Sequence, residues 1–259
     1  RNNNFFGEGK NMKYITSPEN KLYKETKKLL QRQKRYQQGL FIAEGERLVG
    51  EAIACGCAQY VMVSDDYGKA VDFPTTYCLS DKLFKNISDT VTTQGIIAVC
   101  RINPAGLEQI RGGMIVVCDG IGDPGNLGTI IRTAECSGAA AVVLMGNCAD
   151  PYSPKTVRAT MGSIFRMPIC RAEPSDLSKL AEYDIIAAVL ENSTDLYDMK
   201  FGKNTAVIIG NEARGVSEEA ASYANGFVRI PMDGRAESLN AAVAAALIMY
   251  EVRRQNKQE

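Results

Sequence analysis

The chain has 259 residues, of which 45% are hydrophobic and 23% charged, and its formal net charge at pH 7 is zero. This length is sufficient to bury a core in one large domain or two smaller ones without disulfides or metal ions. The chain contains no histidine, which excludes Ser-His-Asp triads, Cys-His pairs and His-ligated zinc from its chemistry.

The N-terminal part begins with an Asn-rich, aperiodic stretch, residues 1–12, which we expect to be a disordered or added leader because Met12 followed by lysine is typical of a natural start. Residues 19–37 predict a polar, basic helix and residues 44–55 a second helix. Seven basic residues lie between positions 21 and 35, opposed only by Glu25. That footprint suits a phosphate backbone and a solvated helix face equally well. The candidate RNA-binding residues are Lys21, Lys24, Lys28, Arg32 and Arg35.

Three strand-like runs follow, at 60–63, 76–79 and 96–100. Residues 13–103 are therefore predicted to form a small α/β domain, and the turn-forming residues after it indicate a linker at 104–111. The first 111 residues carry 16 Lys and Arg against 12 Asp and Glu, whereas the remaining residues carry 14 against 18. The positive charge is thus concentrated in the N-terminal part.

Residues 112–259 show the pattern of a second α/β domain. Five apolar runs alternate there with helical segments, at 114–118, 141–145, 185–189, 205–209 and 227–230. This alternation predicts a mostly parallel sheet with helices on both faces. Ligands of such sheets bind beyond the carboxyl ends of the strands, so the loops that follow the strands are the candidate functional segments.

The first of these loops contains a G-x-G-x-x-G match between Gly120 and Gly125, which raises the alternative of a nicotinamide-dependent dehydrogenase. Pro124 has no amide hydrogen to offer a pyrophosphate, and no acidic residue immediately follows the next strand, so this alternative is disfavoured. Arg132 lies off the apolar stripe of the following helix. Its guanidinium is a candidate phosphate clamp.

The second loop, residues 208–217, contains two glycines that permit close approach of the backbone to a ligand. Its Glu212 is either an acceptor for a substrate or a neighbouring arginine, or a carboxylate at a helix N-terminus. The third loop, residues 230–240, offers Ser238 and Asn240 beside backbone donors, as the binding of adenosine and methionine moieties requires. Capping of the next helix by Ser238 is the alternative.

The longest uninterrupted apolar stretch, from Ala241 to Tyr250, is too short to cross a bilayer, and the N-terminus has no signal-peptide pattern. The eight cysteines are scattered without a C-x-x-C pair, which favours buried, reduced thiols over metal ligands or disulfides. We therefore expect a cytoplasmic protein with neither a membrane partner nor a metal.

Three segments resemble, in order and spacing, the motifs of the SpoU (TrmH-like) family of RNA 2′-O-ribose methyltransferases: D-P-G-N-L-G-T-I-I-R-T-A-E at 123–135, I-I-G-N-E-A-R-G at 208–215 and I-P-M-x-G-x-A-E-S-L-N-A-A-V-A at 230–244. Residues 153–163 resemble the family's intermediate segment. The N-terminal part, through residues 20–24, Arg35 and 41–45, is similar to the ribosomal-protein-like substrate domain of members that act on ribosomal RNA. The resemblance covers nearly the whole chain after Met12. It favours RNA binding over a solvated helix face as the role of the basic residues between positions 21 and 35.

The resemblance implies S-adenosylmethionine as cofactor, an active site shared across a homodimer and a deep trefoil knot in the C-terminal domain, a topology that is rare among proteins. By motif position, the cofactor-binding residues are Ile209, Gly210, Ile230, Met232 and Leu239. The catalytic and substrate positions are Asn126, Arg132, Glu212, Ser238 and Asn240.

The implied reaction is attack of a ribose 2′-oxygen on a sulfonium methyl group, with large-subunit (23S) ribosomal RNA as the expected substrate. Transfer RNA as substrate, and a non-catalytic RNA-binding member of the fold, are the alternatives; the presence of all five catalytic positions argues against the second. Because arginine stays protonated in proteins, we expect Arg132 to clamp a phosphate and stabilise developing oxyanion charge rather than to act as a free base.

Overall fold

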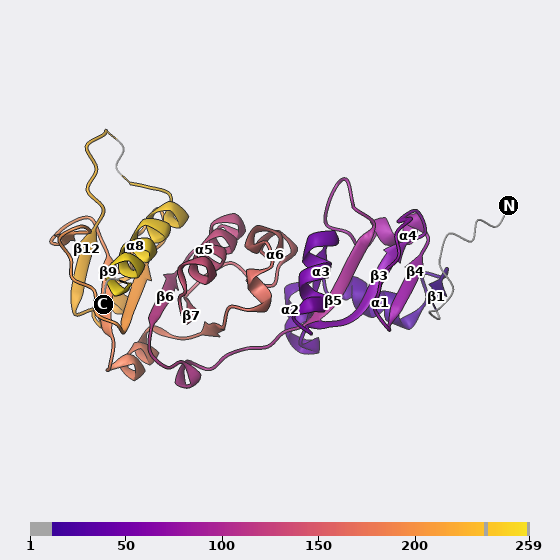
Figure 1. Cartoon of the computed structure of the whole chain (residues 1–259), viewed down its shortest axis with the longest axis horizontal. Helices are drawn as coiled ribbons and strands as arrows, with labels where there is room; N and C mark the ends of the chain where they lie inside the picture. The colour runs from indigo at the N-terminus through magenta and orange to yellow at the C-terminus, as the bar shows by residue number, and fades with distance from the viewer. Residues whose placement is uncertain (1–11, 236–237, 258–259) are drawn as a thin grey trace. The chain divides into compact units, whose positions relative to one another are not determined.

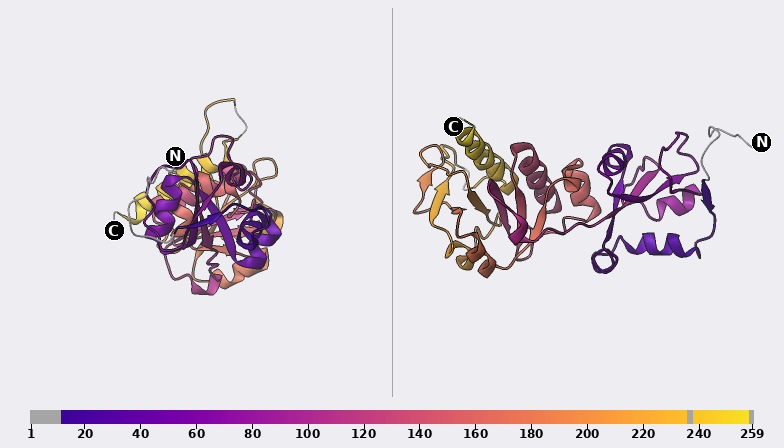
Figure 2. Two further views of the ribbon diagram at one scale, coloured as in Figure 1. Left: turned by 90° about the vertical axis from the view of Figure 1, so that its right-hand side faces the viewer. Right: turned by 60° about the horizontal axis from the view of Figure 1, so that its bottom comes forward.

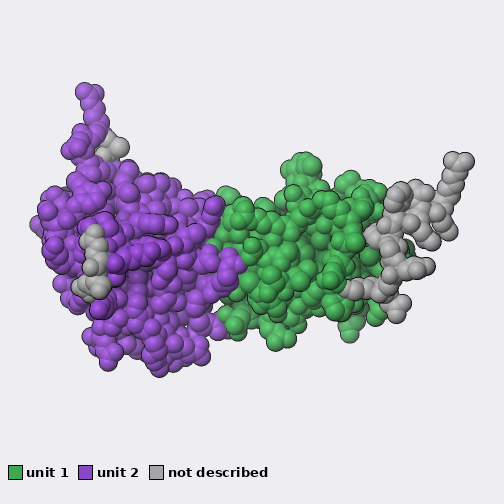
Figure 3. Space-filling view, in the orientation of Figure 1, with its two compact units in different colours: residues 1–103, 152–165 green, residues 104–151, 166–259 purple. Residues whose placement is uncertain are grey.

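The computed structural model of the chain describes residues 12–235 and 238–257. It contains two compact units, shown in separate colours in Figure 3. Unit 1 consists of the described residues up to Asn103 together with Tyr152–Phe165, and unit 2 consists of Pro104–Pro151 and the described residues from Arg166 onward. The sequence had predicted one continuous second domain from 112 to 259, whereas the structure groups residues 152–165 with unit 1. The expected leader lies outside the described residues, apart from Met12.

Unit 1 contains a mixed five-stranded sheet with the order β1-β4-β3-β5-β2. Its strands are β1 (Lys13–Ile15), β2 (Leu40–Glu44), β3 (Ala58–Ser64), β4 (Thr76–Leu79) and β5 (Ile96–Arg101). The first three strands in this order are parallel, and β5 runs antiparallel to both β3 and β2. The sequence predicted β3, β4 and β5 but missed β1 and β2. β1 has only three residues, two of them exposed, and β2 leads directly into the segment predicted as the second helix.

The helices of unit 1 include α1 (Lys21–Lys28), α2 (Arg32–Gln38), α3 (Glu46–Ala54) and α4 (Asp81–Lys85). The prediction of a single helix over 19–37 was wrong, because the helix is interrupted after Lys28 and resumes at Arg32. The side chain of Leu29, in this interruption, is only 1% exposed in the core of unit 1, and its backbone amide donates to the Thr26 carbonyl at 3.0 Å. Burial of one leucine thus outweighs the helical propensity of the polar residues around it.

Aromatic contacts attach residues 152–165 to unit 1. The ring of Phe41 on β2 lies 5.1 Å from that of Tyr152 and 6.0 Å from that of Phe165, measured between centroids. This segment forms α6 (Pro154–Thr160) and the 3₁₀ helix η2 (Ser163–Phe165). Arg158 of α6 also donates to the Asp89 carboxylate of unit 1 at 2.8 Å. Large aromatic surfaces contribute most to such packing, which explains why this segment joins unit 1.

Unit 2 contains a seven-stranded sheet with the order β10-β12-β9-β11-β6-β7-β8, in which every described pairing is parallel. The strands are β6 (Met114–Asp119), β7 (Ala141–Met145), β8 (Ile169–Arg171), β9 (Asp184–Ala188), β10 (Thr194–Asp195), β11 (Thr205–Ile209) and β12 (Gly226–Arg229). The predicted parallel sheet is confirmed. Only β8 and β10 were missed, since neither is longer than three residues.

Helices cover both faces of this sheet, as Figures 1 and 2 show. On one face, α5 (Pro124–Ser137) and α8 (Ala241–Asn256) lie side by side, and on the other lie η3 (Pro174–Leu180) and α7 (Glu218–Ala221). A short 3₁₀ helix, η1 (Leu107–Gln109), precedes the sheet. All residues of β6, β7 and β11 are buried, as expected of central parallel strands. No helix within the described ranges has the length and apolar character to cross a membrane.

The N-terminus of α5 is fixed by local chemistry. The side chain of Asp123 accepts from the Asn126 amide at 2.8 Å, and Pro124 occupies the first turn, where its missing amide hydrogen costs nothing. Gly138, with φ of 80°, ends the helix in the left-handed conformation. The start of α5 therefore presents Asn126 at the carboxyl edge of the sheet.

Candidate cofactor and active site

Four loops at the carboxyl ends of neighbouring strands meet at one edge of the unit 2 sheet. Because β12, β9, β11 and β6 are adjacent and parallel, the segments that follow them gather there. Three of these segments are the loops singled out in the sequence. The fourth, residues 189–193 after β9, was not, although the same rule about strand ends applied to it.

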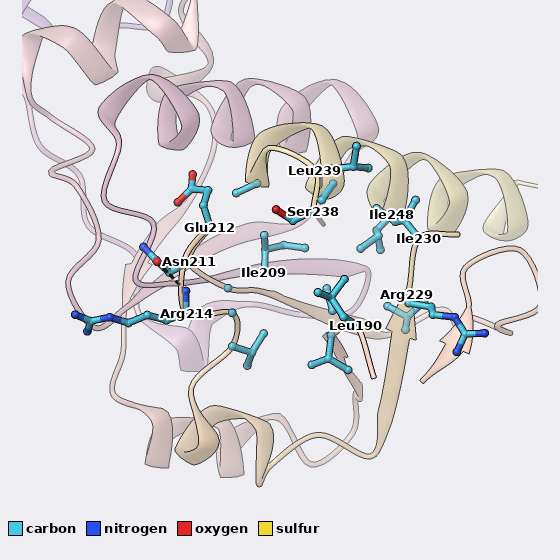
Figure 4. Close-up of a pocket in the computed structure, with 18 of the residues that line it drawn as sticks. Leu190, Ile209, Asn211, Glu212, Arg214, Arg229, Ile230, Ser238, Leu239 and Ile248 are labelled. Carbon is cyan, nitrogen blue, oxygen red and sulfur yellow. Dashed lines mark hydrogen bonds between the residues drawn. The ribbon is translucent and has the colours of Figure 1, made fainter. Parts of the chain in front are cut away.

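Three of these loops, after β9, β11 and β12, together with α8 line a cavity of about 490 Å³, within the usual range for small-molecule sites of about 300–1,000 Å³ (Figure 4). All five predicted cofactor residues line it: Ile209, Gly210, Ile230, Met232 and Leu239. Two of the predicted catalytic residues, Glu212 and Ser238, line it as well. The sequence missed part of the wall, namely Ala188, Val189, Leu190 and Glu191 around the end of β9, and Ala241, Ala244 and Ile248 on α8.

Gly210 lies where the backbone of the second loop folds back on itself. A Cβ atom at this position would lie 2.1 Å from the carbonyl carbon of Gly215 and 2.2 Å from the amide nitrogen of Val216. Asn211 and Gly215 exchange backbone hydrogen bonds of 3.0 and 2.8 Å that close the turn. Only glycine fits at position 210, and the cavity wall depends on that close approach.

Asn211 and Asp119 attach the second loop to the first. The Asn211 amide donates to the Gly120 carbonyl at 3.0 Å, and its oxygen accepts from the backbone amides of Ala213 and Arg214 at 2.9 and 3.2 Å. The buried Asp119 carboxylate accepts from the Ser217 amide at 2.7 Å. Neither side chain was among the predicted site residues. Their partners lie 91 and 98 residues away along the chain, and no local sequence pattern indicates such contacts.

Three predicted catalytic residues form one hydrogen-bonded chain. The Asn126 side-chain amide donates to the Glu212 carboxylate, and the Asn240 amide donates to the Asn126 oxygen at 3.0 Å. Asn240 also caps α8 by accepting from the amides of Ala242 and Val243 at 3.0 and 3.3 Å. These hydrogen bonds therefore link all three loops. The residue that caps α8 is Asn240 and not Ser238, for which capping was the alternative role.

The structure separates Arg132 from this chain of hydrogen bonds. Glu212 accepts from Asn126 rather than from an arginine, and Arg132 has an exposed side chain with no hydrogen bond or ion pair among the described residues. Arg132 does not line the cavity. Its donors are thus available to a ligand approaching from solvent.

Two buried thiols lie beneath the first loop. The Cys148 thiol contacts the backbone oxygens of Cys118 and Met145, each at 3.2 Å. Burial raises the pKa of the Cys148 thiol and holds that of Cys118 well above its usual value. Both therefore remain protonated near neutral pH and are poor nucleophiles. Elsewhere the expectation of buried thiols was only partly right, since Cys55 and Cys136 are exposed.

The basic residues of unit 1 divide into an exposed set and a buried one. Lys21, Lys24 and Lys28 on α1 and Arg32 on α2 are exposed, although Lys24 pairs with Glu19 and Lys28 with Glu25. Arg35 is different: it is only 3% exposed, and its guanidinium donates to the Leu29 carbonyl at 2.7 Å. The prediction that Arg35 binds RNA is therefore corrected, because its buried guanidinium bonds to a backbone carbonyl between α1 and α2.

The contact between Asn126 and Glu212 leads to a prediction about turnover. Glu212→Gln and Asn126→Ala are each expected to lower kcat about tenfold, because a hydrogen bond to a charged group contributes about 1.5–3 kcal/mol and the carboxylate holds the amide in place. The double variant should lose no more than either single one, since both changes break the same contact. Initial rates of all three variants test this, with the exposed Glu219→Gln as control. Additive losses would mean that the two residues act independently.

Two protein-family models match parts of the chain. The sequence model of the SpoU rRNA Methylase family matches residues 113–250, and that of the MRM3-like substrate binding domain matches residues 20–98.

Similar proteins extend over nearly the full length of the chain. It is 36% identical over 249 residues to the 23S rRNA (guanosine(2553)-2'-O)-methyltransferase RlmP of Bacillus subtilis (strain 168), a match that covers 93% of this chain and 100% of that protein. The crystal structure of an AdoMet-bound rRNA methyltransferase from Sinorhizobium meliloti superimposes with a TM-score of 0.84 at 32% identity, covering 94% of this chain and 98% of the other. The SpoU methyltransferase AviRb from Streptomyces viridochromogenes, in complex with AdoMet, gives a TM-score of 0.83 at 28% identity over 92% and 98%.

Proposed function

The chain belongs to the SpoU rRNA methylase family, and from that premise we propose that it methylates a ribose 2′-hydroxyl of large-subunit (23S) ribosomal RNA, with S-adenosylmethionine as methyl donor. The observation that carries the proposal is the cavity at the carboxyl edge of the unit 2 sheet, with the Glu212–Asn126–Asn240 chain at its side. A full-length relative whose name specifies 23S rRNA supports the choice of substrate.

The cavity suits the cofactor. Its walls are mostly aliphatic, from Ile209, Ile230, Leu239 and Ile248, and Gly210 and Gly215 add no side chain that would fill it. When bound, the cofactor supplies a methyl group on a sulfonium for in-line displacement. We assign Ile209, Gly210, Ile230, Met232 and Leu239 to holding it, and Ser238 to a polar contact at the same cavity.

The chain's own residues position the ribose and stabilise charge. We assign to Arg132 a clamp on a substrate phosphate and stabilisation of charge that develops on the 2′-oxygen, since its planar guanidinium is exposed. Asn126 is held between Glu212 and Asn240, so its orientation is fixed before the substrate binds. Glu212 acts through Asn126 and is a positioning residue.

Unit 1 is the proposed substrate-binding unit. Support comes from the matched MRM3-like substrate binding domain and from the exposed cations Lys21, Lys24, Lys28 and Arg32. Such cations contribute sequence-independent affinity for phosphates, and this affinity falls as salt concentration rises. As sequence domains, we propose residues 13–103 for substrate binding, 104–111 as linker and 112–259 as the methyltransferase domain, whose segment 152–165 packs within unit 1.

A knotted C-terminal domain and a cytoplasmic location are further parts of the proposal. Support for the knot comes from the family and from α8, which packs against α5, β6 and β11, so that the end of the chain returns over the centre of the sheet. A crystal structure whose backbone trace is unknotted would contradict it. The location follows from the proposed ribosomal substrate and from eight cysteines that are all free thiols.

We propose that the protein is a homodimer that associates through α8. Val243, Leu247 and Tyr250 recur at helical spacing on this helix and are 48%, 38% and 49% exposed. Three apolar side chains on one face of a helix are typical of an interface. Leu247→Glu is expected to weaken dimerisation on the order of a hundredfold or more, because an unpaired carboxylate buried in an interface costs about 3–5 kcal/mol.

Sedimentation velocity at micromolar concentration measures this effect. Tyr197→Glu, which introduces the same charge at a side chain 61% exposed elsewhere in unit 2, is the matched control and should leave the dimer intact. A wild-type monomer, or a dimer that both variants retain, would contradict the assignment of α8.

Transfer of labelled methyl groups from S-adenosylmethionine to total RNA tests the proposed function. We expect label in 23S ribosomal RNA, at a ribose whose 2′-position becomes resistant to alkaline cleavage, and the guanosine that names RlmP is the first position to inspect. Label confined to transfer RNA would support the alternative substrate. Cofactor binding without transfer to any RNA, including RNA from ribosome-assembly intermediates, would support a binding role instead.

A further inference from the structure

Arg214 has a fixed backbone and an exposed side chain. Its amide donates to the Asn211 oxygen at 3.2 Å, and the next residue, Gly215, adopts φ of 69° within the closed turn. Arg214 is one of the residues that line the cavity, and it is exposed to solvent. The guanidinium thus extends from an anchored point, which lowers the entropy lost when it binds a ligand.

The Arg214 side chain is directed to the rim of the cavity. In Figure 4 it extends past Asn211, away from Leu190 and Ile230, so it does not reach toward the apolar interior. It forms no hydrogen bond or ion pair with any described residue. The other arginine on the cavity wall, Arg229, is already engaged: its Nε lies 2.6 Å from the Asp195 carboxylate, and its Nη1 donates to the Ser193 carbonyl at 2.6 Å.

The carboxylate of Glu212 does not pair with Arg214. Glu212, two residues away, accepts from Asn126 and forms no ion pair with Arg214. The edge of the cavity therefore carries a guanidinium that forms no hydrogen bond with a described residue, on the loop that holds Glu212 against Asn126. A planar group of this kind binds a phosphate through two parallel hydrogen bonds, and does so better than a lysine would.

We propose that Arg214 binds a backbone phosphate of the RNA next to the target ribose, and so positions its 2′-hydroxyl over the cavity. This inference rests on the proposed function, in which the substrate is an RNA strand with a phosphate on each side of the reacting ribose. Arg132, exposed on α5 six residues after Asn126, is assigned the other phosphate clamp. Arg132 on α5 and Arg214 on the second loop thus each present a guanidinium that bonds to no described residue, and the RNA strand has one phosphate on each side of the reacting ribose.

Kinetics on an RNA fragment that the wild type methylates test the proposal. Arg214→Gln is expected to lower kcat/KM for RNA about tenfold or more, consistent with about 1.5–3 kcal/mol for hydrogen bonds to a charged group, and to leave the Kd of S-adenosylmethionine unchanged. It should also reduce the slope of log affinity against log salt by about 0.7, the contribution of one phosphate on a single strand. Arg214→Lys should restore part of the activity. Lys200→Gln, which removes an exposed charge of unit 2 outside the cavity wall, is the matched control.

A neutral phosphate identifies the contact directly. Replacing one phosphate beside the target ribose by a methylphosphonate should lower kcat/KM of the wild type, and the same replacement should have little further effect on Arg214→Gln. Additive losses at both flanking phosphates, an unchanged kcat/KM in Arg214→Gln, or a loss confined to cofactor affinity would each overturn the proposal. Wild-type turnover on the unmodified RNA, measured alongside, tests the proposed function separately.

Discussion

Arg132→Ala is expected to lower kcat for methyl transfer by about 10²–10³, the usual loss when one preorganised donor to developing charge is removed. The Kd of S-adenosylmethionine should stay within about twofold of the wild type, because Arg132 does not line the cavity and forms no hydrogen bond or ion pair with any described residue. Single-turnover rates and calorimetric cofactor binding measure the two quantities independently. A variant that loses cofactor affinity in proportion to rate would mean that Arg132 acts on the cofactor rather than on the RNA.

Arg132→Lys separates charge from geometry at the same position. Lysine keeps the positive charge but has no planar fork for a bidentate phosphate contact, so we expect most of the loss seen with alanine to persist. Full activity of Arg132→Lys would exclude the clamp and leave only a requirement for charge.

Gly210→Ala is expected to raise the Kd of S-adenosylmethionine about a hundredfold and to lower the Tm by several degrees. The new Cβ atom would lie 2.1 Å from a backbone carbon and 2.4 Å from a backbone oxygen of Gly215, so the turn itself must move. Overpacking of this kind costs about 1–3 kcal/mol, and here the displaced backbone is the wall of the cavity. The turn also carries Asn211 and Glu212, so the contact with Asn126 should be lost as well.

Two other glycines provide matched controls for this effect. At Gly215 a Cβ atom meets nothing within 4 Å but φ is 69°, so Gly215→Ala adds about 1–2 kcal/mol of left-handed strain without a clash. At Gly234, in the third loop, a Cβ atom also lies in open space and φ is unremarkable, so Gly234→Ala should be neutral. Losses that decrease from Gly210 to Gly215 to Gly234 would identify the steric contact as the cause. Equal losses at all three positions would instead indicate a general need for flexible loops.

Much of unit 2 could be predicted from the sequence because its central strands are short apolar runs separated by helices. β6, β7 and β11 are entirely buried, and this burial appears in the sequence as uninterrupted hydrophobic residues. Strands shorter than four residues, β1, β8 and β10, leave no such pattern and were missed. The single helix predicted over 19–37 was wrong for a different reason. The sequence pattern favours a continuous helix there, but the helix is interrupted where Leu29 is buried in the core of unit 1.

By itself, the sequence determined which residues are available for chemistry: three polar loops at strand ends, five residues that line the cavity and a set of basic side chains. Only the tertiary structure decided how they are used. It joined Asn126 to Glu212 across 86 residues and to Asn240 across 114, buried Arg35, brought Leu190 to the cavity and attached residues 152–165 to unit 1. Periodicity reports whether a residue is buried within its own helix or strand. Partners distant along the chain are selected by packing and by the need to satisfy buried polar groups, and these depend on where the other segments lie.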